Sequence, residues 1–264
     1  MVVLEHFFKY AFVIIISYLL AIATLSNQSQ PLQQLPPNEE VAITSFIFFL
    51  IGALLIFIAI KYLNVGFLLN IFEFILLFFS SYVIAYALLQ NYGLALIAAI
   101  ATTFLRALRF ISMNNAALIT SIGGALIIGV IFPIFPLIIF AFLLVLYDIF
   151  AVFISGHMIE LAHIAKKQEA AMAIETKQIK KIGRKKAILS IIMGTGDFVL
   201  PSAIAISSIQ QSMPLSLYML LAGLIGYWFV MLVLYKLKRP LPALPFILFP
   251  QFIIFLLYFL GFSI

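Results

Sequence analysis

Apolar runs long enough to cross a lipid bilayer follow one another along almost the whole sequence, and this feature leaves few folds open. Hydrophobic residues make up 66% of the 264 positions, whereas charged residues make up 9%. A soluble domain has about 25% charged residues, so this chain has too little polar surface to fold in water. One spanning helix needs about 20 apolar residues. The sequence therefore predicts an all-α membrane protein, built as a single multi-pass domain over residues 1–264.

Nine apolar runs are candidates for transmembrane helices. The predicted spans cover residues 7–25, 41–60, 66–89, 92–105, 115–132, 135–155, 187–209, 214–235 and 243–263. The fourth run is short for a full crossing, and the fifth and sixth are divided only by Pro133 and Pro136. The first run lacks the small-residue cleavage pattern of a signal peptide, so it is expected to be retained.

The lysine and arginine residues test this count independently, because basic residues collect in the cytoplasmic connections of membrane proteins. All 15 of them lie near the amino end or after spans two, four, six and eight. The opposite connections, such as 27–40 and 210–213, contain none. This alternation predicts nine transmembrane helices in a cell membrane, with a cytoplasmic N-terminus and the C-terminus outside. Topology thus accounts for the net charge of +6, and no nucleic-acid partner is expected.

The longest connection, 156–186, carries eight basic residues and is predicted to be a cytoplasmic loop. Apolar residues alternate with the charged ones and include Ile159, Leu161, Ile164 and Ala171. Two interpretations remain open. The loop forms a surface helix that rests on anionic membrane lipid, or it is a solvated basic loop that only fixes the topology.

Neither a metal site nor another cofactor is expected. The chain has no cysteine, which excludes disulfides, thiolate metal sites and a cysteine nucleophile. His157 and His163 are six residues apart and do not share a helix face well enough to bind one metal ion.

Three acidic residues lie inside predicted spans: Glu73, Asp148 and Asp197. A charged side chain in the bilayer core costs at least about 2.5 kcal/mol, so such acids are candidates for a functional site. Asp148 and Asp197 lie roughly 10 Å and 15 Å of helix from the cytoplasmic ends of the sixth and seventh predicted spans. Because these spans are antiparallel neighbours, the two carboxyl groups are expected to meet at a similar depth.

Two carboxyl groups that share one proton can hydrolyse a peptide bond. The ionised acid activates water, and the protonated acid donates to the carbonyl oxygen. The same pair also suits a proton or cation relay in a transporter or channel, and that alternative stays open. Glu73, one turn from Asn70, has either a structural or lipid-interface role, or it forms with Asn70 a polar seam that faces the active-site cavity.

Short motifs surround these acids. Gly194, Thr195, Gly196 and Asp197 form a GxGD sequence, in which glycine permits close backbone approach and local unwinding. Tyr147 precedes Asp148 within the sixth span. A third motif, made of Pro242, Ala243 and Leu244, opens the last span between Pro240 and Pro245. Prolines at this density predict an extended segment, although proline also suits a helix start.

Together, the YD, GxGD and PAL motifs resemble those of the presenilin and signal peptide peptidase family of intramembrane aspartyl proteases. The resemblance covers nearly the whole chain in span layout and motif order. It implies a presenilin-like fold and a catalytic pair made of Asp148 and Asp197. The residues expected to bind substrate are Tyr147, Gly194, Thr195, Gly196, Pro242, Ala243 and Leu244.

The family resemblance also implies substrates and partners. Single-span transmembrane proteins or peptides are the expected substrates, and a homo-oligomer is compatible with the sequence. The cytoplasmic N-terminus and long loop are similar to the presenilin branch, whereas Pro201 is reminiscent of the peptidase branch. The small size resembles the prokaryotic, mainly archaeal, homologues, which work without accessory subunits. A non-catalytic membrane chaperone that binds single-span partners is a third interpretation.

Overall fold

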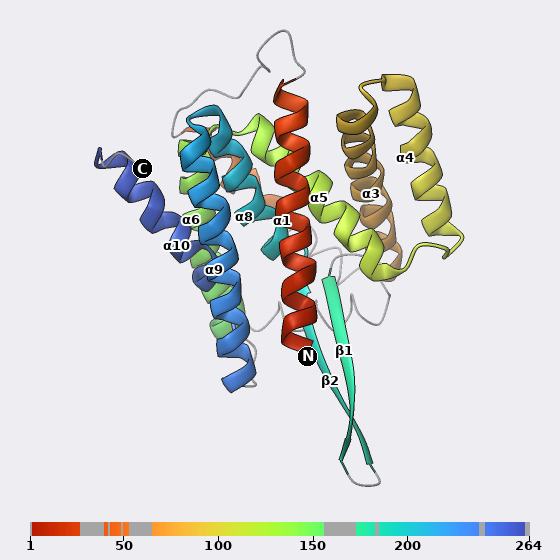
Figure 1. Cartoon of the computed structure of the whole chain (residues 1–264). Helices are drawn as coiled ribbons and strands as arrows, with labels where there is room; N and C mark the ends of the chain where they lie inside the picture. The colour runs from red at the N-terminus through yellow and green to blue at the C-terminus, as the bar shows by residue number, and fades with distance from the viewer. Residues whose placement is uncertain are drawn as a thin grey trace.

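The computed structural model describes residues 2–26, 40–41, 43–48, 50–52, 65–155, 173–182, 185–237 and 241–261. Helices dominate these residues, and a two-stranded sheet accompanies them (Figure 1). The helices are α1 Val2–Ser26, α3 Val65–Leu89, α4 Tyr92–Ala107, α5 Met113–Ile131, α6 Ile134–Phe150, α8 Gly196–Ser207, α9 Met213–Leu237 and α10 Leu244–Phe259. A π-helical turn, Ala151–Ser155, extends α6, and a 3-10 turn, Ser208–Gln210, follows α8.

Most of the predicted spans coincide with these helices. Within the described ranges, five helices are long and apolar enough to cross a membrane, and α4 and α10 are shorter apolar helices. The short fourth span exists as α4, whose first turn is capped by the Asn91 side chain through the N–H of Leu94 at 3.1 Å. Pro133 ends the connection between α5 and α6, so the predicted break between these spans is confirmed. The second predicted span is helical wherever it is described.

The seventh predicted span, 187–209, is wrong before Gly196. Residues Lys185–Gly194 form strand β2, which pairs antiparallel with β1, Ala173–Ile182, and helix α8 begins only at Gly196. An apolar run of this length fits a strand as well as a helix, and three isoleucines favour the strand. The end of the predicted cytoplasmic loop and the start of the predicted seventh span thus form a hairpin that extends beyond the bundle at the end where α1 begins (Figure 1). The four apolar residues expected on a surface helix lie outside the described ranges.

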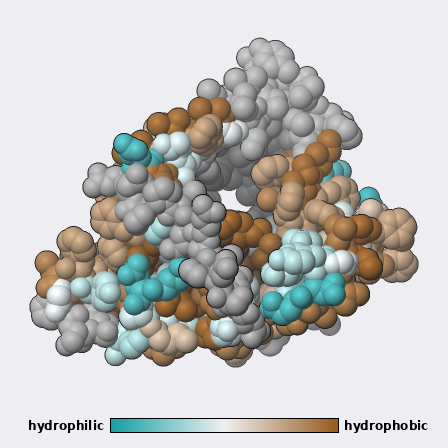
Figure 2. Space-filling view, turned by 90° about the horizontal axis from the view of Figure 1, so that it is seen from above, coloured by the Kyte–Doolittle hydropathy of each residue, from teal (hydrophilic) through white to brown (hydrophobic). Residues whose placement is uncertain are grey.

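Small residues allow the helices to approach closely. A side chain at Gly123 of α5 would collide with Ser80 of α3, and one at Gly226 of α9 would collide with the backbone of Ile247 in α10. The outer faces of the helices instead carry large apolar side chains, such as Phe8, which is 61% exposed. Figure 2, which views the molecule from above, shows brown hydrophobic residues over much of this face, with teal hydrophilic residues in small patches. Such a surface is suited to lipid rather than water.

Candidate active site

Asp148 lies near the end of α6, just before the π-helical turn, and is 9% exposed. Its Oδ2 atom accepts a hydrogen bond from the backbone N–H of Leu244 at 3.2 Å, and its carboxyl group also accepts from the N–H of Ala243. The first N–H groups of a helix have no partners within the helix. The Asp148 carboxyl group therefore caps α10 from a distant part of the chain, although capping groups usually come from the residue before the helix.

The prediction that the PAL segment is extended is only partly right. Leu241 and Pro242 lie outside regular structure, but Ala243 has helical angles of φ −84° and ψ −41°, and Leu244 is the first residue of α10. Pro245 follows in the first helical turn, where proline is tolerated because its missing N–H is not needed there. The cap from Asp148 makes it favourable for the helix to begin at Leu244. The prolines alone do not predict this cap, because it comes from a distant part of the chain.

Asp197 is the second residue of α8 and is partly exposed. Its carboxyl group accepts a hydrogen bond from the backbone N–H of Gly194 and lies close enough to Asp148 for the two acids to interact electrostatically. Helices α6 and α8 are in contact, as expected for antiparallel neighbours. The structure thus brings both predicted acids into one site, together with Tyr147, which interacts electrostatically with Asp148.

The two glycines beside Asp197 leave space rather than allow close packing. A Cβ atom at Gly194 would lie 3.8 Å from Asp197 Oδ2, and beyond the adjacent residues and the backbone of α8 itself, no heavy atom of the described chain lies within 4 Å of the position of a Cβ at Gly196. Neither glycine has a positive φ angle. Within the described chain, neither glycine is needed for close packing of one helix against another. Thr195, between them, has helical angles and leads directly into α8.

Buried aromatic residues that the sequence did not single out lie behind Asp197. The rings of Tyr10 and Tyr227 stack with centroids 3.7 Å apart and planes at 6°, and Phe198 packs edge-on against both at 5.5 Å. Tyr227 donates to Met193 Sδ at 3.2 Å. These contacts tie the start of α8 to α1 and α9. Aromatic residues inside apolar runs carry no distinctive sequence signal, so this cluster is visible only in three dimensions.

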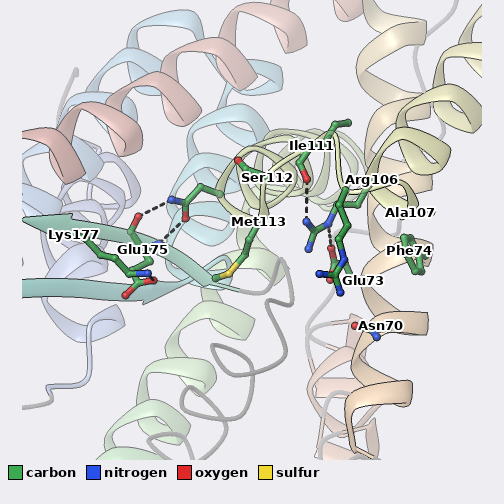
Figure 3. Close-up of a pocket in the computed structure, with 12 residues that line it drawn as sticks. Asn70, Glu73, Phe74, Arg106, Ala107, Ile111, Ser112, Met113, Glu175 and Lys177 are labelled. Carbon is green, nitrogen blue, oxygen red and sulfur yellow. Dashed lines mark hydrogen bonds and ion pairs between the residues drawn. The ribbon is translucent and has the colours of Figure 1, made fainter.

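The third intramembrane acid, Glu73, does not join the aspartates. It is 4% exposed on α3 and forms an ion pair with Arg106 of α4, with 2.6 Å between Oε1 and Nε. Figure 3 shows this pair in a separate pocket of about 540 Å³, to which Asn70 also contributes. The structure favours the structural interpretation of Glu73.

A helical bundle of membrane-spanning length with two interacting aspartates on neighbouring helices defines the class of intramembrane aspartyl proteases. Comparison with known proteins agrees with this class. The chain belongs to the signal-peptide peptidase and presenilin aspartyl protease family, because the model of that family matches residues 9–264. It is accordingly a multi-pass membrane enzyme of the aspartic endopeptidase type, as the motifs predict.

Solved structures support the same fold. Two crystal forms of a presenilin family intramembrane aspartate protease, in space groups P2 and C222, superpose on the chain with TM-scores of 0.66 and 0.63. Each is 20% identical in sequence, and 96% of this chain is covered together with 96% and 95% of the other chain, respectively. No sequence among the curated proteins gives a significant match.

Proposed function

We propose that the chain hydrolyses peptide bonds within the transmembrane segments of single-span membrane proteins, with Asp148 and Asp197 as its catalytic pair. The observation that carries this proposal is that the two carboxyl groups, on the contacting helices α6 and α8, lie within electrostatic range of each other, with Asp148 bonded to the start of α10. No metal or other cofactor is needed for this chemistry, because the acids themselves activate water and polarise the carbonyl.

The reaction uses one ionised and one protonated aspartate. The ionised carboxylate takes a proton from water as its oxygen attacks the scissile carbonyl carbon, and the protonated carboxyl group gives its proton to the carbonyl oxygen. The tetrahedral intermediate then collapses, the C–N bond breaks, and the leaving nitrogen takes a proton from the pair. Hydrogen bonds from the backbone of Gly194 to Asp197, and of Ala243 and Leu244 to Asp148, orient the two acids for these transfers.

A substrate helix must unwind before this reaction, because its carbonyl groups are engaged in helical hydrogen bonds. We expect the unwound segment to be held as a strand. In the described residues, β2 pairs with β1 alone and ends at Gly194, so its second edge leads toward Asp197. The open space at Gly196 accommodates the substrate backbone. Tyr147, Thr195 and the PAL residues Pro242, Ala243 and Leu244 complete the proposed substrate-binding surface.

The proposed orientation has nine spans, a cytoplasmic N-terminus and the C-terminus outside. The positions of basic residues from different parts of the chain support it. Lys9 of α1 donates to the Glu175 carbonyl in β1 at 3.3 Å, and Arg106 lines the same pocket as Lys177. Because positive residues concentrate on the cytoplasmic side, their meeting at one end of the bundle fits a cytoplasmic hairpin and a cytoplasmic N-terminus.

The proposal is tested with purified protein in detergent, incubated with a transmembrane peptide, with and without a transition-state inhibitor of aspartyl proteases. Inhibitor-sensitive fragments are expected from the unchanged chain and from Glu40→Gln, a control at an exposed acid outside the pair. Asp148→Ala and Asp197→Ala are expected to yield no fragments. Full activity in either variant would sink the assignment. Proton-coupled uptake into vesicles without fragments would instead indicate a relay, and peptide binding without any product a chaperone.

A further inference from the structure

The backbone of Glu175, near the start of β1, is held by the side chain of Asn114 from the first turn of α5. Asn114 Nδ2 donates to the Glu175 carbonyl oxygen at 2.8 Å, and the Glu175 N–H donates to Asn114 Oδ1, also at 2.8 Å. The dashed lines at Glu175 in Figure 3 mark these contacts. The side-chain amide presents the same donor and acceptor pair as a peptide group, so it pairs with the backbone of Glu175 as a residue of a neighbouring strand would.

The next residue of β1, Thr176, is fixed by α1. Its hydroxyl group lies 2.7 Å from His6 Nδ1 and accepts a hydrogen bond from Lys9 Nζ at 2.9 Å, and the residue is only 1% exposed. Two consecutive residues of the strand are thus anchored to two different helices. The start of the hairpin therefore has a defined position against the bundle.

The pairing of β1 with β2 links the anchored start of β1 to the candidate active site. Glu175 pairs with Ile192, and Ala173 pairs with Gly194, the residue whose N–H donates to the Asp197 carboxyl group. Two residues of extended strand span about 7 Å, so the Asn114 anchor acts close to the GxGD turn. A shift of β1 would move β2, and with it the hydrogen-bond donor of Asp197.

We propose that Asn114 is a positioning residue for the reaction: by clamping the backbone of Glu175, it sets the β1–β2 hairpin so that the Gly194 N–H orients Asp197. This inference rests on the proposed catalytic role of Asp197. Asn114 acts through the hairpin and does not contact the reacting atoms. Its loss is expected to lower kcat and leave KM nearly unchanged, because the misplaced group is the acid rather than a surface that binds substrate.

The decisive variant is Asn114→Asp. An ionised aspartate keeps the acceptor for the Glu175 N–H but has no donor for the Glu175 carbonyl, whereas a protonated aspartate restores both. Its activity relative to the unchanged chain is therefore expected to rise as the pH falls. The charged and titratable groups around this position are Glu175 and Lys177 on β1, Glu73 on α3, Arg106 in the last turn of α4, Arg109 in the connection to α5, and His6 and Lys9 on α1.

The experiment measures kcat and KM for peptide cleavage across a range of pH for Asn114→Ala, Asn114→Asp and Asn115→Ala. The last variant is the matched control, at the adjacent exposed asparagine. We expect kcat to fall about 10- to 100-fold in Asn114→Ala, as for a small misplacement of a reacting group, and to stay unchanged in Asn115→Ala. In Asn114→Asp, the ratio of its kcat to that of the unchanged chain should rise as the pH is lowered, because the protonated aspartate restores both hydrogen bonds.

Asp197→Ala is measured in parallel and separates the two hypotheses. If Asp197→Ala cleaves normally, the proposed function fails. If Asp197→Ala is inactive while Asn114→Ala keeps its kcat, the catalytic pair stands and the positioning role of Asn114 is overturned. If Asn114→Ala does not fold, Asn114→Asp decides, because a kcat ratio that does not change with pH contradicts the clamp.

Discussion

The ion pair between Glu73 and Arg106 lends itself to a quantitative test of how α3 and α4 are held together. The side chains are 4% and 11% exposed, and their atoms Oε1 and Nε are 2.6 Å apart. Arg106 Nη1 also donates to the Ile111 carbonyl oxygen at 2.9 Å. Both charges are withdrawn from water, so each depends on the other for compensation.

Removing one partner of such a pair costs about 3–5 kcal/mol, because the remaining charge stays buried without a counterion. Glu73→Leu and Arg106→Leu are each expected to destabilise the protein by this amount. The two single losses would sum to at least about 6 kcal/mol. The double variant leaves neither charge, and replacing a whole buried pair with apolar residues is often neutral, so its loss is expected to stay below about 2 kcal/mol.

The free energy of unfolding of all four proteins is measured by denaturant titration in one detergent, together with peptide cleavage. The double variant is expected to retain kcat, because the pair lies outside the candidate active site. Glu5→Gln, which breaks the pair between the exposed Glu5 and the half-buried Lys9, is the control and should cost less than about 1 kcal/mol. Losses that add in the double variant, or single variants as stable as the unchanged chain, would refute the reasoning.

Three further substitutions test the packing and the site. Gly226→Ala should destabilise the protein by about 1–3 kcal/mol, because the new methyl group meets the backbone of Ile247; an unchanged midpoint of unfolding would contradict this close contact. Gly196→Ala should leave stability within about 0.5 kcal/mol but lower peptide cleavage, and normal cleavage would show that substrate does not occupy the open space there. Gln251→Leu removes donors to two buried carbonyls, at 2.9 Å each, and should cost about 1–3 kcal/mol per carbonyl by denaturant titration, whereas Gln210→Leu in the exposed turn after α8 should cost little.

The sequence is sufficient to find most of the helices and the two aspartates. Charged residues inside apolar runs are rare because they are costly, so Asp148 and Asp197 stand out by residue type and position alone. Proline and basic residues separate neighbouring spans for the same physical reasons that operate in the folded protein. The family and enzyme class follow from motifs close to these acids, and both are confirmed.

The features that sequence reasoning misses depend on partners from distant parts of the chain. The apolar residues before Gly194 fit a helix or a strand equally well, and their pairing with β1 is what makes them a strand. The early start of α10 depends on a cap from Asp148, about a hundred positions earlier in the chain. Asn114 and Arg106 are ordinary polar residues at the ends of spans, and only the folded structure shows what each one holds.

The cap that Asp148 provides makes the first turn of α10 a native reporter of the candidate active site. A ligand that competes for this carboxyl group would also withdraw an acceptor from the Leu244 amide, whose hydrogen bond to Asp148 measures 3.2 Å. Hydrogen exchange or the nitrogen chemical shift at this one amide should therefore follow inhibitor binding without any added label. The first turn of α10 is in this way chemically linked to the protonation and ligand state of Asp148 on α6.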